Sequence, residues 1–281
     1  MGLNLARLRD FVGSAMMFIV ALAVNSAGAA ITDWQGEGNA KVRLIASGID
    51  ASGHISAGIE IGIAPGWKTY WRTPGDAGVA PLIDFSSSSN INGPVFIEFP
   101  VPHRVDDGYA VTNVYEDQVV LPVTIAATDP ESAARLVLSL DIGVCAEICI
   151  PEHYDVTLDL APGETDATAA AILADARRAL PRGPTPGEFE IGRVRRVGGT
   201  DKRPVFEFQI IAADAANAEV FVEGPADWYP SMPKLVASDE VGATFSVEFN
   251  RLGSKIPIGG NAFTVTVVAT GGAIEDTATL D

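Results

Sequence analysis

The sequence predicts an all-β protein in which a β-sandwich is followed by a linker helix and a second, smaller β-sandwich domain. Short apolar or alternating segments recur along most of the 281 residues and are separated by Gly and Pro. Because helical patterns do not alternate with these segments, the arrangement is typical of sandwiches rather than of a βαβ fold. One helical pattern, followed by a Pro- and Gly-rich stretch, divides the chain into two parts.

The first 29 residues have the pattern of a secretory signal peptide. A positively charged start precedes an apolar run of 14 residues, 11–24, and residues 27–29 read Ala-Gly-Ala, a typical cleavage site. The run is short for a bilayer span, which favours cleavage over the alternative of an uncleaved anchor. We therefore expect export to the periplasm of a Gram-negative-type cell and removal of residues 1–29.

The first sandwich is assigned to residues 30–164. Its clearest strand is 54–64, where Ile55, Ile59 and Ile63 fall on one face and Ser56 falls on the other. Turn residues such as Pro65-Gly66 separate the strands. The expected strands are 41–47, 54–64, 67–71, 81–85, 95–99, 119–128, 135–142 and 154–160.

Residues 165–187 are expected to form a helix and a linker. Ala169, Leu173 and Ala176 recur at helical spacing, and Thr165 or Asp166 can cap the start. Prolines and glycines at 181–187 then end the helix and stiffen the connection.

The second sandwich is assigned to residues 188–281. Its expected strands are 189–197, 205–212, 219–223, 244–249 and 263–269. This part of the sequence contains no Cys and no His. We therefore expect a spacer or a docking module rather than a reactive site.

The charge balance narrows the classes of partner. The formal net charge is −17, and such a surface repels phosphate, which excludes nucleic acid as an expected partner. Beyond the signal segment, no stretch of sequence is long and apolar enough to cross a membrane, so a soluble mature protein is expected.

The two cysteines of the chain, Cys145 and Cys149, lie close together. In an exported protein they are expected to form one disulfide. Closing so short a loop stabilises a fold by about 2 kcal/mol, against nearly 5 kcal/mol for a loop of 100 residues. The spacing therefore favours a redox-active bond over a structural staple, which remains the alternative. Pro151 disfavours a helix here, so the pair is expected across a hairpin or strand end.

The surroundings of the pair predict little activation of either thiol. The nearest charge in sequence is Glu147, which would raise a thiol pKa, and no neighbouring Lys or Arg opposes it. The pair is therefore interpreted as a carrier that depends on activated partners. A metal site made of both cysteines with His153 and His103 is a further alternative, but Pro151 argues against the unbroken helix it would need.

Three ordered motifs then resemble a known family. Residues 66–78 read GWKTYWRTPGDAG, residues 114–123 read VYEDQVVLPV, and residues 145–151 read CAEICIP. Over roughly residues 41–160, the sequence is similar to the DsbD-like N-terminal domain family, the periplasmic disulfide-exchange domains related to DsbD and ScsB. The other side chains of the first motif have simpler expectations: Trp67, Tyr70 and Trp71 pack, and Arg72 pairs locally with Asp76.

The resemblance implies an immunoglobulin-like fold and a redox-active disulfide, without a cofactor or a metal. By position, Cys149 matches the cysteine that forms the mixed disulfide with partners, and Cys145 matches its companion. A cap loop that gates access is implied by Asp106, Asp107 and Tyr109, with Tyr115 on the strand that follows. The sequence departs from the family in its shorter cysteine spacing and in Gly108, where an aromatic residue is expected.

The predicted function is thiol–disulfide interchange in the periplasm through Cys145 and Cys149. The resemblance implies that reducing equivalents pass between thioredoxin-like proteins or a membrane thiol conduit and oxidised periplasmic proteins, with cytochrome c biogenesis among the destinations. The family's transmembrane conduit and thioredoxin-like domain have no counterpart in the sequence, so another protein is expected to supply electrons. The alternative is a non-catalytic binding or assembly module with a structural disulfide.

Overall fold

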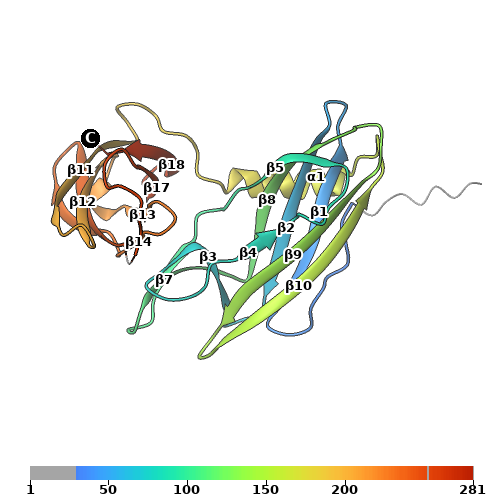
Figure 1. Cartoon of the computed structure of the whole chain (residues 1–281), viewed down its shortest axis with the longest axis horizontal. Helices are drawn as coiled ribbons and strands as arrows, with labels where there is room; N and C mark the ends of the chain where they lie inside the picture. Colours follow the sequence, from blue (N-terminus) through green and yellow to red (C-terminus); the bar gives the residue numbers. More distant parts are fainter. Residues whose placement is uncertain (1–29, 252, 281) are drawn as a thin grey trace, which may run out of the picture.

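The strands form two β-sandwiches that lie side by side as separate lobes (Figure 1). The computed structural model describes residues 30–251 and 253–280. The predicted signal peptide, residues 1–29, lies outside the described residues. The all-β fold predicted from the sequence is confirmed. Within the described part of the chain, no helix has the length and apolar character that crossing a membrane would require.

The first sandwich packs a four-stranded sheet, ordered β1-β2-β8-β5, against a six-stranded sheet. In the larger sheet β10-β9-β3-β7-β6 follow one another, and β4 pairs with β9. Aliphatic side chains from both sheets fill the core, and Trp71 is the largest fully buried side chain. The strands are β1 (Ala40–Ile49), β2 (His54–Ile63), β3 (Lys68–Gly75), β4 (Leu82–Asp84), β5 (Ile91–Ile97), β6 (His103–Asp106), β7 (Val111–Glu116), β8 (Gln118–Ala127), β9 (Ala134–Cys145) and β10 (Cys149–Leu160).

The β6–β7 hairpin joins β7, the strand of Tyr115 implied by the family resemblance, to β6, which the sequence pattern does not reveal. β6 has only four residues, and the turn between the strands contains Asp107 and Gly108. So short a strand beside turn residues gives little alternation to detect. The cap loop implied by the family resemblance is therefore the tip of a hairpin, paired through β7 to β3.

β2 is buried on both faces, although its sequence alternates. The isoleucines face the core as predicted, while the opposite face is covered by the helix and by side-chain pairs. A Cβ added at Gly58 would lie 2.7 Å from Leu173 Cδ2, so this glycine makes room for the helix. Glu60 is buried on the same face, where Arg43 Nε and Gln118 Nε2 donate hydrogen bonds to its carboxylate.

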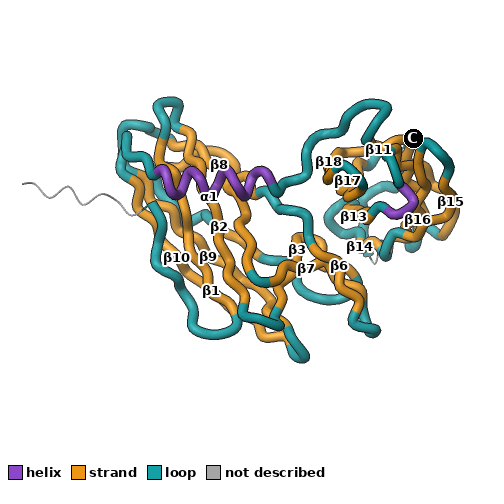
Figure 2. The backbone as a smooth tube through the Cα atoms, turned by 180° about the vertical axis from the view of Figure 1, so that it is seen from behind, coloured by secondary structure: helices purple, strands orange, loops and turns teal. Residues whose placement is uncertain are grey.

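Helix α1 (Ala167–Arg178) lies across the outer face of the four-stranded sheet, as seen from behind in Figure 2. Asp166 caps it, since its Oδ1 accepts a hydrogen bond of 2.7 Å from Ala169 N. Ala169 and Leu173 are buried against Ile45 of β1. The segment expected to act as a linker helix thus packs as part of the first sandwich.

The second sandwich encloses a core of aromatic side chains. Phe206, Trp228, Phe249 and Phe263 pack with ring centroids 5.2–6.1 Å apart. One sheet is ordered β11-β12-β16-β14, with β15 on β16, and the other is ordered β13-β17-β18. The strands are β11 (Glu190–Gly199), β12 (Pro204–Ile211), β13 (Glu219–Glu223), β14 (Tyr229–Pro230), β15 (Lys234–Ser238), β16 (Gly242–Asn250), β17 (Ala262–Ala269) and β18 (Gly272–Thr279).

The connection between the sandwiches is tied to β18 rather than free. Arg182 forms an isolated parallel bridge with Ile274, in which its N–H donates to Ala273 O and its carbonyl accepts from Glu275 N. The Pro- and Gly-rich stretch therefore docks on the second sandwich as it enters it.

Leu173→Ala tests whether α1 is part of the first sandwich. The change leaves a cavity between α1 and Gly58, so the free energy of unfolding is expected to fall by about 2–4 kcal/mol in urea titrations. Thr168→Ala, on the exposed side of the same helix, is the control and is expected to change it by less than about 0.5 kcal/mol. Equal, small effects of both changes would contradict the packing described.

Candidate disulfide-exchange site

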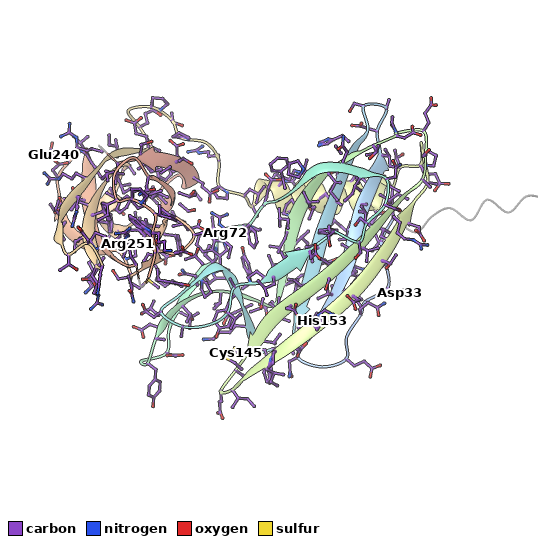
Figure 3. The ribbon with its side chains drawn as sticks, in the orientation of Figure 1. Asp33, Arg72, Cys145, His153, Glu240 and Arg251 are labelled. Atoms are coloured by element: carbon purple, nitrogen blue, oxygen red, sulfur yellow. A yellow bond between two sulfur atoms is a disulfide. The ribbon has the colours of Figure 1, made fainter. Side chains whose placement is uncertain are left out.

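The β9–β10 hairpin holds the two cysteines directly opposite each other. Cys149 is the register partner of Cys145, and the three residues between them form the turn, closed by a hydrogen bond from Ala146 N to Ile148 O. The sulfurs are joined in a disulfide, with the two Cα atoms 4.1 Å apart. The predicted disulfide and its place in a hairpin are both present. Figure 3 labels Cys145 near this end of the first sandwich.

The two sulfurs differ in their access to solvent. Side chains alternate along β9, so Val144 points into the core while Cys145 lies on the outer face of the six-stranded sheet. Cys145 is nevertheless only 1% exposed, because Tyr70, Val105 and Val114 pack around it. Cys149 is exposed at the start of the edge strand β10. A molecule arriving from solvent therefore meets Cys149 first.

Tyr70 contacts both sulfurs from the neighbouring strand β3. Its hydroxyl donates a hydrogen bond of 3.1 Å to Cys145 Sγ and lies 3.5 Å from Cys149 Sγ. Burial, assisted by the negative charge of Asp107, raises the pKa of Tyr70 above its ordinary value. The hydroxyl therefore keeps its proton at neutral pH and is a donor toward sulfur.

A basic side chain also stands beside the buried cysteine. Lys68 is the register partner of Cys145 across β3 and β9, so the two side chains share one face of the sheet. Its Nζ lies 3.9 Å from Asp107 Oδ2. No Lys or Arg flanks the cysteines in sequence, but strand pairing brings Lys68 beside Cys145. The pairing of distant strands places Lys68 there, and local sequence does not show it.

The structure shows why the first motif has a glycine at position 78. Gly78 adopts a φ of +104°, and a Cβ at this position would lie 2.3 Å from the ring of Tyr70. Only glycine lets the backbone lie flat against that ring. Gly143 lies on the sheet beside the same ring, where a Cβ would make contact at 3.5 Å. The two glycines therefore frame Tyr70 over the disulfide.

The cap residues form a tight turn at the tip of the β6–β7 hairpin. Asp107 Oδ1 accepts hydrogen bonds of 3.0 Å from both Tyr109 N and Ala110 N, and these hold the pKa of Asp107 below its ordinary value. Asp106 Oδ1 accepts one of 2.9 Å from Gly108 N. The Tyr109 ring is 99% exposed. In this structure it is Tyr70, not Tyr109, that covers the disulfide; a gating role for Tyr109 stays a prediction.

Two other residues of the motifs lie on the opposite side of the sheet from the disulfide. Tyr115 is buried in the sandwich core, and its hydroxyl donates a hydrogen bond of 2.6 Å to Pro100 O. Burial raises the pKa of Tyr115 well above its ordinary value. Trp71 fills the same core. Tyr115 thus supports β7 from behind and does not touch the sulfurs.

An apolar groove of about 400 Å³ runs beside Cys149 between β4 and β10. Its walls include two strongly exposed aliphatic side chains, Val79 and Leu82, with Pro151 on β10. His153 closes the far end. Its Nδ1 lies 2.8 Å from Asp141 Oδ1 and its Nε2 lies 3.3 Å from Asp155 Oδ2. These two carboxylates raise the pKa of His153, chiefly through their hydrogen bonds.

The four side chains considered as metal ligands do not come together as a metal site. Both sulfurs are committed to the disulfide, and His153 pairs with Asp141. His103 lies on β6, where it pairs with Val114. Among residues 30–251 and 253–280, no group of three or more His, Cys, Asp or Glu side chains is arranged to hold a metal ion.

Comparison with known proteins places the part of the chain that carries this disulfide in a known domain family. The profile of the family described as thiol:disulfide interchange protein DsbD, N-terminal, matches residues 40–161. Residues 40–161 form a DsbD-like N-terminal domain. The resemblance in the three motifs, the immunoglobulin-like fold and membership of a thiol–disulfide exchange family are thereby confirmed for this part of the chain.

A solved structure extends the likeness to both sandwiches. The N-terminal periplasmic domain of ScsB from Proteus mirabilis is 25% identical, with a TM-score of 0.68, and the match covers 89% of this chain and 98% of that one. CfaE, the adhesive subunit of a fimbria of enterotoxigenic Escherichia coli, matches at 8% identity with a TM-score of 0.15, too low to support an argument. No curated protein matches the sequence significantly.

Sequence reasoning missed Tyr70 and Lys68 as parts of the DsbD-like site and assigned Arg72 to the wrong partner. Arg72 pairs with Glu223 and Glu275 of the second sandwich and not with Asp76. The signal that would have found Tyr70 is its alternation with Trp71: one of two adjacent aromatic residues on a strand must leave the core.

The pH dependence of His153 tests the arrangement at the end of the groove. Because its pKa is raised in the folded state, the stabilisation from Asp141 and Asp155 is fully present below about pH 6.5 and is lost as pH rises through the raised pKa. NMR titration is expected to show a pKa that falls on Asp141→Asn. The control is Asp159→Asn on β10, the strand of His153. This change removes the ion-pair partner of Arg135 and leaves the carboxylates beside His153 in place. A pKa indifferent to Asp141 would contradict the contact.

Proposed function

We propose that this chain is a periplasmic thiol–disulfide interchange protein that passes reducing equivalents through Cys145 and Cys149. The observation that carries the proposal is a disulfide with one sulfur exposed and the other buried under a tyrosine hydroxyl. The DsbD-like domain supports it, as does the likeness to a periplasmic domain of ScsB. Thioredoxin-like proteins and a membrane thiol conduit are the partners proposed.

The exchange begins at the exposed sulfur. A partner's thiolate attacks Cys149 Sγ, the bond between the two sulfurs breaks, and Cys145 leaves as a thiolate. The partner's second thiol, once deprotonated, attacks the partner's own sulfur in the mixed disulfide and releases Cys149. The partner departs with a disulfide, and this chain keeps two electrons and the two protons that the partner's thiols gave up. The reverse sequence reduces an oxidised protein.

The surroundings of Cys145 favour its departure. Exchange is faster when the leaving thiolate is stabilised, and a hydrogen bond from Tyr70 stabilises a thiolate at that position. Lys68 is the cross-strand neighbour of Cys145, and its charge is partly balanced by Asp107. The phenol of Tyr70 is protonated at neutral pH even at its ordinary pKa, and burial raises that pKa further, so its hydroxyl remains a donor to sulfur. The apolar groove beside Cys149 leaves the partner's approach to that sulfur open.

Trapping tests the proposal. With Cys145→Ala, Cys149 remains free on the surface and is expected to capture thiol partners as adducts that dithiothreitol releases, detected on non-reducing gels and by mass spectrometry of a periplasmic extract. Cys149→Ala leaves only the buried cysteine and is the matched control, expected to capture far less. A Cys145→Ala form that yields no such adduct would point to a structural disulfide instead.

Tyr70→Phe tests the role of the hydroxyl. Losing the hydrogen bond to the Cys145 thiolate is expected to lower the equilibrium constant for reduction by dithiothreitol by about ten- to a hundredfold, because a hydrogen bond to a charged group is worth about 1.5–3 kcal/mol. The ring stays, so packing is preserved. Tyr115→Phe, which removes a hydroxyl on the opposite face of the sheet, should leave this constant unchanged. Equal values for Tyr70→Phe and the wild type would remove Tyr70 from the site.

A further inference from the structure

The second sandwich forms hydrogen bonds and ion pairs with β3, the strand that carries Tyr70. Arg72, two residues after Tyr70 on β3, donates from Nε and Nη2 to both carboxylate oxygens of Glu223 on β13, at 2.6–3.1 Å. Its Nη2 also donates to Glu275 of β18. Thr73 Oγ1 donates a hydrogen bond of 2.9 Å to the same Glu223 carboxylate. Figure 3 labels Arg72 on the side of the first lobe that faces the second.

These contacts are partly buried, and the single guanidinium of Arg72 faces two carboxylates. The side chains of Arg72 and Glu223 are 22% and 21% exposed. Burial alone would lower the pKa of Arg72, but the hydrogen bonds and charges of Glu223 and Glu275 raise it. Thr266 Oγ1 donates to Glu275 and fixes the orientation of that carboxylate. A bidentate pair of this kind fixes geometry as well as contributing energy.

The same face of the second sandwich also holds the cap hairpin. Arg104 on β6 donates a hydrogen bond of 2.8 Å to Val220 O, and its guanidinium lies 4.5 Å from the ring centroid of Phe221. Phe221 in turn packs edge-on against Trp71, with the centroids 5.4 Å apart. Strand β13 therefore contacts both β3 and β6.

The first motif ends in a close approach between the two lobes. A Cβ added at Gly75 would lie 2.6 Å from Val111 O and 2.9 Å from Met232 Cε of the second sandwich. Asn113 Nδ2 on β7 donates a hydrogen bond of 2.9 Å to Thr73 O. The contacts thus link the second sandwich, the motif strand and the cap hairpin into one packed unit.

We propose that the second sandwich is a clamp that positions the disulfide site, with Glu223 as its principal positioning residue acting on Tyr70 through Arg72. The clamp holds β3 and the β6–β7 hairpin so that the Tyr70 hydroxyl stays next to the sulfurs and Asp107 stays beside Lys68. This rests on the proposed function of the cysteine pair, because what the clamp tunes is how readily that pair is reduced.

The test uses the full chain and dithiothreitol as the probe, so that it does not depend on any protein partner. Glu223→Ala is expected to lower the equilibrium constant for reduction of the disulfide by about three- to tenfold, in the direction of Tyr70→Phe. In the double variant, Glu223→Ala should add nothing to Tyr70→Phe, since it acts through that residue. Hydrogen exchange of the amides at 108–111 is expected to become faster.

The controls separate positioning from stability. Glu207→Gln breaks an exposed ion pair with Arg195 on the same sandwich and is expected to leave the equilibrium constant unchanged. Thr73→Val removes one hydrogen bond to the Glu223 carboxylate and gives a milder variant, should Glu223→Ala fold poorly. A folded Glu223→Ala or Thr73→Val variant with the wild-type equilibrium constant overturns the clamp, and so does full additivity of Glu223→Ala with Tyr70→Phe. Failure to trap a partner through Cys149 would leave this result unaffected and bear only on the proposed function.

Discussion

The pairing of Cys149 opposite Cys145 in the β9–β10 hairpin fixes where the disulfide lies. Side chains alternate along β9, so a one-residue shift in the register of this strand would turn Cys145 into the core and Val144 to the outer face. The apolar residues of β9 exclude this shift, because Leu136, Leu138, Leu140 and Val144 all require the core face. The hydrophobic core of the first sandwich therefore holds the disulfide on the outer face of its larger sheet.

The neighbouring strand then turns an ordinary hairpin disulfide into an asymmetric site. Strand β3 pairs with β9 only at its first two residues, which places Lys68 beside Cys145 and sends Tyr70 over the sulfurs. Cys145 is covered as a result, while Cys149 at the sheet edge stays open. Such a difference in access between two bonded sulfurs favours attack at the open one.

Local sequence predicted what depends on neighbours in the chain. The hairpin around Cys145 and Cys149 follows from Pro151 and the short spacing, and the α1 helix follows from the periodicity of Ala169 and Leu173 with Asp166 as its cap. The contacts that define the site join residues far apart: Tyr70 and Cys145 are 75 positions apart, and Arg72 and Glu223 are 151 apart. Strand register determines such contacts, and alternation alone does not specify it.

The same reasoning explains why three adjacent residues of the first motif are so different in character. Tyr70, Trp71 and Arg72 each face a different environment: the disulfide, the sandwich core and the second sandwich. A regular strand has only two faces, so a third environment requires an irregularity in the strand. Strand β3 provides one, because its regular pairing with β7 ends after Tyr70. That irregularity frees Arg72 from the disulfide face and lets it reach Glu223. One short strand thereby ties the position of the tyrosine to the core on one side and to the second lobe on the other.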